Sequence, residues 1–543
     1  MKADFLGLTF AQLSGLLLGI FGLVLPFLLP LGTLSFAGQL GLGILLLAAA
    51  FWIFEPIPIF ATSMLVIFLQ VFLLSAQSPV FSEAELPVTE PVDMSHSSWQ
   101  IPASALKDDQ TILVSVGPGE TKSIHVSITE RNGQHAIVKS DELRADHPVI
   151  TQPNHRLVNY DPSSYTAFTG TLAHGIIILF LGGFMLAGAS VKYNLDKNLT
   201  RYLLAPFGSK PRFILLGIIL VTAVLSAFMS NTATAAMMVT VIIPIIAQLD
   251  PKDQFKYGLA LAIPIAANIG GIATPIGTPP NAIAIGALQG QGIDITFTEW
   301  MIVAVPIVLI MLFISWVLLQ FFFPPKIDRF KLQLDGKLNL EPKAIGLYII
   351  FAATVILWIT EEFHGIPSNM IAFIPVATLV AGGILTKEDV KKIPWDVLWL
   401  MAGGLSLGVS MQATGLAAWL IGGVDWASLG YVALILSFAL VAVAMSNFLS
   451  NTVTATLIMP LVIGLYLSGT MGDNFSLIIV GVVIAVSCSL AMALPISTPP
   501  NAIAMSTGFI RTKDMAKVGL TVGFIGIIMI LIMSIAYWPF VTP

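Results

Sequence analysis

One polar triplet occurs twice inside apolar stretches that otherwise avoid polar side chains, as Ser230-Asn231-Thr232 and Ser450-Asn451-Thr452. Each copy is followed by a proline break, "TPIGTPPNAIA" from Thr274 and "LPISTPPNAIA" from Leu494. Hydroxyl and amide groups donate hydrogen bonds to anions, and their oxygens, like carbonyls freed by proline, bind cations such as Na⁺. The helix restarting after each break directs free N–H groups at the same place. These residues predict an uncharged site for an anion accompanied by cations.

A single offset of 220 residues relates the two motifs. It superposes Asn231 on Asn451, and it also aligns Ser226 with Ser446, Pro279 with Pro499, Pro280 with Pro500 and Asn281 with Asn501. In both copies the triplet asparagine precedes the "PPN" asparagine by 50 residues. Agreement at so many polar and proline positions indicates an internal duplication.

A purely structural role for these polar residues is the alternative. Serine and threonine in membrane helices often bond back to the carbonyl four residues earlier, or join neighbouring helices. Asparagine is costly in hydrocarbon, however, and here it recurs at matched positions beside a proline break. We therefore expect the duplicated triplets to bind a ligand.

The composition identifies a membrane protein that crosses the bilayer several times. Of 543 residues, 56% are hydrophobic and only 10% are charged, against about 25% charged in soluble proteins. The small net charge of -5 and the scattered basic residues exclude a nucleic-acid partner. A single cysteine, Cys488, excludes an internal disulfide and any metal cage built from several thiolates.

The elements that must position the motifs are membrane helices of two kinds. Continuous apolar stretches, each near the roughly 20 residues that a bilayer requires, lie at 6–30, 34–54, 57–76, 172–190, 300–323, 344–360, 367–384, 396–411 and 519–540. Four other stretches are interrupted by the motifs, at 213–249, 257–288, 428–470 and 476–508. Polar breaks at such depth predict re-entrant hairpins and discontinuous helices.

The basic residues predict the orientation. We assume that each continuous span crosses the membrane and that each triplet stretch enters and leaves on the same side. One face then carries all of the following basic groups: Lys2, 192–212, 252–256, 326–343, 387–392 and 511–517. By the positive-inside rule that face is cytoplasmic, so the N-terminus is expected there. The protein is expected in the cell (inner) membrane, with the stretch 77–171 on its extracytoplasmic side. Its alternating hydrophobicity and Gly-Pro-Gly and Asn-Gly turns predict a small β-rich extracytoplasmic insertion.

Five crossings separate the first triplet hairpin from the second, and because this number is odd the two repeats are expected to be inverted, as in secondary transporters. The expected fold class is therefore an all-α polytopic membrane protein with two inverted repeats, re-entrant hairpins and broken helices, plus the β-rich insertion. The expected parts are scaffold helices 1–76, the insertion 77–171, a last scaffold helix and amphipathic connector 172–212, transport-domain half 213–323, scaffold helices 324–427 and transport-domain half 428–543.

The inferred site contains no Lys, Arg or His, so a dianion there needs co-bound cations to offset its desolvation. Na⁺ suits the available oxygens, whereas protons would need a titratable group at depth. An enzyme is disfavoured because no Ser-His or metal arrangement occurs at depth. A sodium-independent exchanger, or a carrier of sulfate, citrate or tartrate, remains the open alternative to sodium symport.

These motifs, with "LFLGGFMLA" before the first hairpin, resemble the divalent anion/sodium symporter family, especially its bacterial sodium-dependent dicarboxylate transporters. The resemblance implies a homodimer in the lipid bilayer. It implies a scaffold domain and a transport domain that moves by an elevator mechanism. Succinate, malate, fumarate or related C4 dicarboxylates are the implied cargo, with Na⁺ as the co-transported ion and no organic cofactor.

The resemblance also implies roles for individual residues. The substrate-binding residues would be Ser230, Asn231, Thr232, Thr278, Ser450, Asn451, Thr452, Thr498 and Pro499. One Na⁺ site would use Ser226, Ser230, Asn231 and Gly277, and the other Ser446, Leu449, Asn451 and Ser497. At the second Na⁺ site this sequence departs from the family pattern, because Ser446 and Ser497 stand where the family has Thr and Ala.

Overall fold

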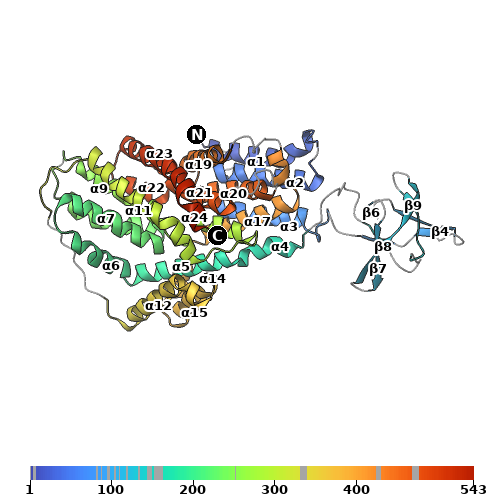
Figure 1. Ribbon diagram of the computed structural model, residues 1–543, viewed down its shortest axis with the longest axis horizontal. Coiled ribbons are helices and arrows are strands. Elements are labelled where there is room, and N and C mark those ends of the chain that lie inside the picture. The colour runs from blue at the N-terminus through green and yellow to red at the C-terminus, as the bar shows by residue number, and fades with distance from the viewer. Residues whose placement is uncertain are drawn as a thin grey trace.

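The computed structural model describes a largely helical protein (Figure 1). The residues described are 2–3, 8–32, 34–80, 84–86, 89–93, 98–102, 106–108, 111–117, 120–131, 135–142, 149–151, 163–250, 252–330, 339–422, 430–467 and 476–542. Among these residues, eight helices are long and apolar enough to cross a membrane. Parts of the predicted segments 324–427 and 428–470, namely 331–338, 423–429 and 468–470, lie outside the described residues. The helix lengths and composition identify an integral membrane protein.

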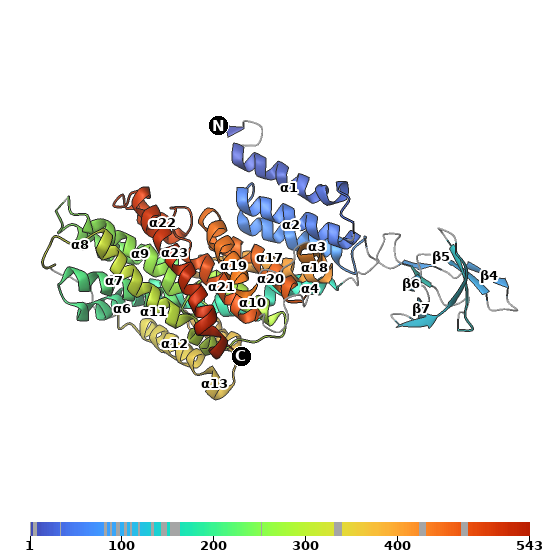
Figure 2. The ribbon, with the colours of Figure 1, turned by 45° about the horizontal axis from the view of Figure 1, so that its top comes forward.

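The continuous helices of the N-terminal part follow the predicted spans closely. They are α1 (Phe10–Leu28), α2 (Phe36–Phe54), α3 (Ile59–Leu74) and α5 (Gly175–Lys192), with the connector α6 (Leu195–Leu204) after α5. Helix α1 begins at Phe10 rather than near residue 6, because Thr9 and Gln12 form a reciprocal capping box there. A strand pair, β1 (Lys2–Ala3) with β2 (Leu8–Thr9), precedes it. In Figure 2, α1 lies at the edge of the body beside α2.

A second set of helices separates the two motif-bearing halves. It comprises α12 (Pro342–Ile359), α13 (Glu361–His364), α14 (Ser368–Ile371), α15 (Phe373–Ala381), α16 (Lys387–Val390), α17 (Trp395–Ala413) and α18 (Leu416–Gly422). Helix α17 packs on α3, where the buried Gln70 amide donates to Ser410 Oγ at 2.9 Å and to the Ser406 carbonyl at 3.1 Å. These two hydrogen bonds lie inside an apolar interface, and they join the N-terminal helices to the central ones.

The two motif-bearing halves contain the same sequence of helices. The first half has α7 (Pro211–Phe228), α8 (Asn231–Ile246), α9 (Phe255–Gly271), α10 (Pro279–Gln289) and α11 (Phe297–Phe322). The second has α19 (Gly430–Phe448), α20 (Asn451–Leu467), α21 (Leu477–Leu490), α22 (Pro499–Ser506) and α23 (Thr512–Ala536). The triplets therefore lie at the breaks between α7 and α8 and between α19 and α20, and the "TPPN" motifs lie where α10 and α22 begin.

Glycine permits the close approach of α7 and α9. A Cβ atom at Gly270 would lie 2.4 Å from Ala223 Cα and 2.5 Å from its carbonyl oxygen, all of them backbone atoms that cannot yield. Even alanine is therefore too large at this crossing. The glycine brings the end of α9 directly against the hairpin helix that leads to the first triplet.

The insertion is β-rich, as predicted, and extends from the helical body next to α3 (Figure 1). Its strands are β3 (Ala84–Leu86), β4 (Thr89–Asp93), β5 (Ser98–Pro102), β6 (Leu106–Asp108), β7 (Thr111–Gly117), β8 (Glu120–His125), β9 (Ser127–Arg131), β10 (His135–Lys139) and β11 (Val149–Thr151). They form two antiparallel sheets, ordered β4-β5-β10-β9 and β3-β11-β7-β6 with β8 beside β7. Both sheets contribute to one apolar core that includes Ile101, Val114 and Val138.

The helical body resumes before residue 171, the predicted end of the insertion. Helix α4 (Tyr165–Thr169) and a following 3₁₀ turn already belong to the helical body, because Ser164 caps α4 and Phe168 is fully buried against the helices. The chain leaves and re-enters the body at one place, since Ala76 N donates to the Ser163 carbonyl at 2.9 Å.

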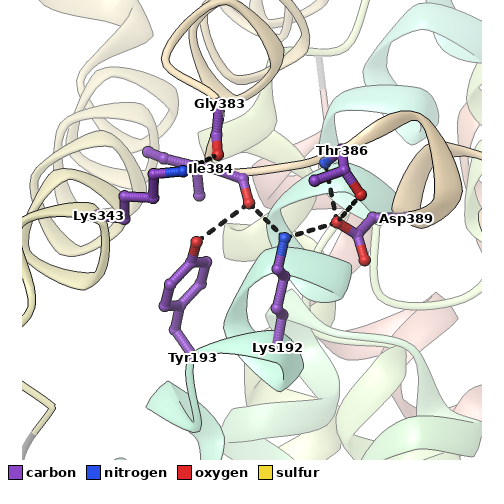
Figure 3. A network of polar contacts seen from close by, with 7 residues as sticks. All are labelled: Lys192, Tyr193, Lys343, Gly383, Ile384, Thr386 and Asp389. Atoms are coloured by element: carbon purple, nitrogen blue, oxygen red, sulfur yellow. Dashed lines mark hydrogen bonds and ion pairs between the residues drawn. The ribbon is translucent and has the colours of Figure 1, made fainter.

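A polar network holds the end of α5 against the segment between α15 and α17 (Figure 3). Lys192 Nζ donates to the Ile384 carbonyl at 2.8 Å and pairs with Asp389 Oδ2 at 2.6 Å. The Tyr193 hydroxyl donates to the same carbonyl at 3.2 Å, and Thr386 N and Oγ1 donate to Asp389 at 2.8 and 2.7 Å. The Lys192 ammonium, followed by the Thr386 donors, holds the pKa of Asp389 well below its usual range.

Deleting residues 78–162 with a short Gly-Ser linker should leave a folded protein in the membrane. The deletion joins two points that lie side by side, because Ala76 N donates to the Ser163 carbonyl, and the helical body loses only the contacts of Ser78 and Val80. Monodispersity and thermal unfolding in detergent, compared with the full chain, measure the outcome. A deletion protein that aggregates on extraction would show that the insertion is needed for the helical fold.

Substituting Lys192 by Met, which keeps the apolar stem, should lower the melting temperature in detergent. Asp389→Asn should do the same, and the loss in the double variant should be smaller than the sum of the two single losses, because the two residues share one ion pair. The lowered carboxyl pKa means that this stabilisation is present above the unfolded value near 3.8 and is lost only as pH falls through the lower folded value. The difference in melting temperature between the wild-type protein and the variants should therefore stay the same from pH 8 to pH 5. Additive losses would contradict the pairing.

Candidate functional site

One cavity of about 720 Å³ brings the motifs of both halves together. All nine predicted substrate-binding residues line it: Ser230, Asn231, Thr232, Thr278, Ser450, Asn451, Thr452, Thr498 and Pro499. Gly277 and Ser497, predicted for the cation sites, also line it. Residues separated by more than 200 positions in the chain thus face a single space, as the 220-residue duplication predicted.

Four helices begin at the cavity wall. Ser230 is the N-terminal cap of α8, Thr278 that of α10 and Thr498 that of α22, while α20 begins at Asn451 with Ser450 Oγ accepting from Val453 N at 3.2 Å. Every helix start carries the positive end of the helix dipole. Helices α8 and α20 also carry unpaired N–H groups there, whereas α10 and α22 begin with two prolines that have none. The convergence of the four helix starts gives the cavity a positive potential made of neutral groups, which suits an anion.

The first triplet has a cluster of oxygens behind it. Ser226 Oγ lies 2.5 Å from Asn231 Oδ1 and 2.8 Å from the Ala267 carbonyl oxygen. When Asn231 turns its amide oxygen toward Ser226, one hydroxyl proton serves only one of these two contacts, and the cluster has more lone pairs than protons. The Gly277 carbonyl oxygen and the Asn231 amide also lie beside Gly271: a Cβ there would be 3.0 Å from Gly277 O, 2.7 Å from Asn231 Oδ1 and 2.9 Å from Asn231 Nδ2. An arrangement of neutral oxygens short of protons is suited to a small hard cation.

The second triplet repeats this cluster with differences. Ser446 Oγ lies 2.7 Å from Asn451 Oδ1 and 3.0 Å from the Cys488 carbonyl oxygen. Ser497, at the position matching Gly277, donates to the Asn447 carbonyl at 2.9 Å. Of the predicted cation ligands, Ser226, Ser446 and Leu449 are not among the cavity-lining residues: the serines lie behind the asparagines, and Leu449 immediately precedes the break.

The "PPN" asparagines hold the broken backbone, a role that the sequence did not reveal. Asn281 Nδ2 lies 3.0, 3.2 and 2.8 Å from the carbonyl oxygens of Gly271, Ile272 and Thr274. Asn501 Nδ2 lies 2.9 Å from those of Met492 and Leu494. Side-chain amides therefore donate to the carbonyls at the breaks, and each of these carbonyl oxygens keeps a second lone pair.

Two further asparagines at the site were missed by the sequence analysis. Asn268 lines the cavity, and Asn447 accepts from Ala493 N at 2.9 Å and binds Ser497. Both lie in apolar helices, where an asparagine is costly and signals a role. Neither asparagine is duplicated, because the matching positions hold Cys488 and Ala227.

The expectation of a site without basic residues is too broad for the whole cavity. Asp389, Lys392 and Asp396, from the segment that includes α16 and the start of α17, line the cavity as well. Lys392 and Asp396 are exposed, so this end of the cavity is its open mouth. The tertiary structure brings a loop with fixed charges to the mouth, while the converging helix starts carry neutral side chains.

Comparison with known proteins agrees with this architecture. Residues 49–485 match the sequence profile of the citrate transporter family, CitMHS. The sodium-dependent dicarboxylate transporter SdcS of Staphylococcus saprophyticus is 33% identical over 429 residues, covering 71% of this chain and 80% of that protein. SdcS of Staphylococcus aureus strain USA300 is 34% identical over 407 residues, covering 67% and 77%.

A solved structure shares the fold. The YdaH transporter of Alcanivorax borkumensis matches with a TM-score of 0.50 and 12% sequence identity, covering 69% of this chain and 87% of that one. These relatives are transport proteins and not enzymes. The duplicated motifs, the shared cavity and these matches together establish that the chain belongs to the citrate transporter (CitMHS) and divalent anion/sodium symporter family.

Proposed function

We propose that this protein is a sodium-coupled secondary transporter that imports C4 dicarboxylates such as succinate, malate and fumarate. The observation that carries the proposal is the convergence of four helix starts and two triplets on one cavity, with a proton-poor oxygen cluster behind each triplet asparagine. The names of the Staphylococcus relatives support both the sodium dependence and the dicarboxylate cargo.

The substrate carboxylates would bind the residues that line the cavity from both halves. The cavity-facing hydroxyl and amide groups of the triplets, with Thr278, Thr498 and Pro499, would contact them. Na⁺ would bind behind the triplets, at Ser226, Ser230, Asn231 and Gly277 and at Ser446, Leu449, Asn451 and Ser497. Each net positive charge moved inward across 100 mV releases about 2.3 kcal/mol. Uptake is driven by the potential once the co-transported Na⁺ outnumbers the negative charges of the cargo.

An elevator mechanism in a homodimer is part of this proposal. The segments 213–323 and 428–543 would form the moving transport domain, and 1–76, 172–212 and 324–427 the scaffold. The two halves would be inverted repeats, and 77–171 would be extracytoplasmic. The charged cavity mouth at Asp389 and Lys392 belongs to the basic cluster expected at the cytoplasmic face. We infer that the cavity opens toward the cytoplasm.

A sodium-independent exchanger, or a carrier of a larger or different anion, is the second candidate. Two observations favour it: Lys392 supplies fixed positive charge at the cavity, and the matching family profile is named for citrate. Uptake by exchange would require a counter-anion inside the vesicle rather than a Na⁺ gradient.

Labelled succinate should enter proteoliposomes only with an inward Na⁺ gradient, and faster when the interior is negative. Replacing external Na⁺ by choline should abolish uptake, because the dianion then lacks its counter-charges. Competition by unlabelled malate, fumarate, citrate, tartrate and sulfate ranks the cargo. Equal uptake in choline, dependent on internal dicarboxylate, would establish the exchanger instead.

Asn231→Ala and Asn451→Ala should each lower sodium-driven uptake at least about tenfold, since losing one hydrogen bond to a charged group costs about 1.5–3 kcal/mol. The matched controls are Thr240→Ala and Ser437→Ala. Their hydroxyls bond back to their own helices, to the Met237 and Ala433 carbonyls at 2.7 Å, and lie outside the cavity. Near-wild-type uptake in both asparagine variants would refute the site.

A further inference from the structure

Asn268 connects the two halves directly at the cavity. It belongs to α9 of the first half, is only 1% exposed, and lines the cavity. Its amide nitrogen lies 3.1 Å from Thr498 Oγ1 and 3.4 Å from Asn501 Oδ1, both in the second half. The 220-residue offset places Cys488 at the matching position, so the second half has no such amide.

The surrounding contacts determine which way the Asn268 amide points. Asn501 Nδ2 must face the Met492 and Leu494 carbonyls, both 2.9 Å away, because these can only accept. Asn501 Oδ1 is therefore directed toward Asn268 and needs a donor. Asn268 must present its NH₂ group to that oxygen, and the same group then reaches Thr498 Oγ1.

These contacts use both lone pairs of the Thr498 hydroxyl. One accepts from Asn268 Nδ2 at 3.1 Å, and the other from the Asn501 backbone N–H at 3.3 Å. A hydroxyl oxygen has two lone pairs and one proton, so the group is left only with its proton to share. Thr498 lines the cavity, and the cavity is where a partner for that proton can bind.

The first half lacks this arrangement. Thr278, the match of Thr498, caps α10 without a side-chain hydrogen bond. Asn281 Oδ1, the match of Asn501 Oδ1, is buried with no hydrogen-bond partner in the described part of the chain. Cys488, at the position that matches Asn268, carries a thiol, which is a weaker donor on a shorter side chain.

We propose that Asn268 is a positioning residue that makes Thr498 an obligate donor to a substrate carboxylate. The two ends of the site are then unequal: one carboxylate binds a pre-oriented donor at Thr498, and the other meets an unoriented hydroxyl at Thr278. A hydroxyl already oriented loses no rotational freedom when the anion arrives, which strengthens binding. The inference rests on the proposed dicarboxylate transport.

The test is a double-mutant cycle on the KM for succinate in sodium-driven uptake. Thr498→Val should raise KM about tenfold, the loss of one charge-assisted hydrogen bond. Asn268→Cys, which copies the second half, keeps the Thr498 hydroxyl but leaves it unoriented, and should raise KM about threefold. The double variant should be no weaker than Thr498→Val alone, because Asn268 acts through that hydroxyl. In the matched control, Asn268→Cys with Thr278→Val, the two effects should multiply.

Asn268→Leu, of similar size and without a donor, replaces the cysteine variant if that one does not fold, and should give the same cycle. The inference would be overturned if the fold-changes in KM from the Asn268 and Thr498→Val substitutions multiplied, as those from Asn268 and Thr278→Val should. An unchanged KM in both Asn268 variants would overturn it too. Wild-type protein that takes up no dicarboxylate would overturn the proposed function, and this inference with it. Wild-type uptake combined with multiplying effects overturns only the role of Asn268.

Discussion

The structure depends on one constraint: a backbone broken inside an apolar body must have its polar groups satisfied by the protein itself. Asn281 and Asn501 meet it, each placing one amide against the carbonyls exposed by the preceding break. Trp300 Nε1 adds a bond to the Ile272 carbonyl at 3.0 Å. Because side chains hold the breaks, the helix starts beyond them can face a cavity.

The duplication produced two similar walls that now differ in detail. Each triplet asparagine has a serine hydroxyl close behind it, at 2.5 Å in the first half and 2.7 Å in the second. Around this shared unit, Gly277 is matched by Ser497, Ala227 by Asn447 and Asn268 by Cys488. These exchanges redistribute hydrogen-bond donors between the halves, so a symmetric cargo would meet an asymmetric site.

Charge is arranged by depth. The triplets and helix starts present neutral groups, whereas Asp389, Lys392 and Asp396 line the mouth. Asp389 is already paired with Lys192, and the same lysine caps the Ile384 carbonyl (Figure 3). Fixed charges at the mouth remain hydrated and cost little, while a fixed charge at depth would need a permanent partner. The neutral donors found at depth avoid that requirement.

The sequence alone determined the helical membrane fold and the β-rich insertion, and it singled out the two triplets and the two proline breaks. These follow from local chemistry: apolar length, proline breaks, turn residues and a repeat read at one offset. The full set of nine substrate-binding residues was expected from the family resemblance. Only the tertiary structure decided which carbonyls the "PPN" asparagines take, that Lys392 reaches the cavity, and that Asn268 bonds to Thr498. Those contacts join residues that no local pattern relates, because they depend on how two distant helices pack. The repeat does not reveal Asn268, because the residue at the matching position is Cys488. That difference is the reason why Asn268 is important.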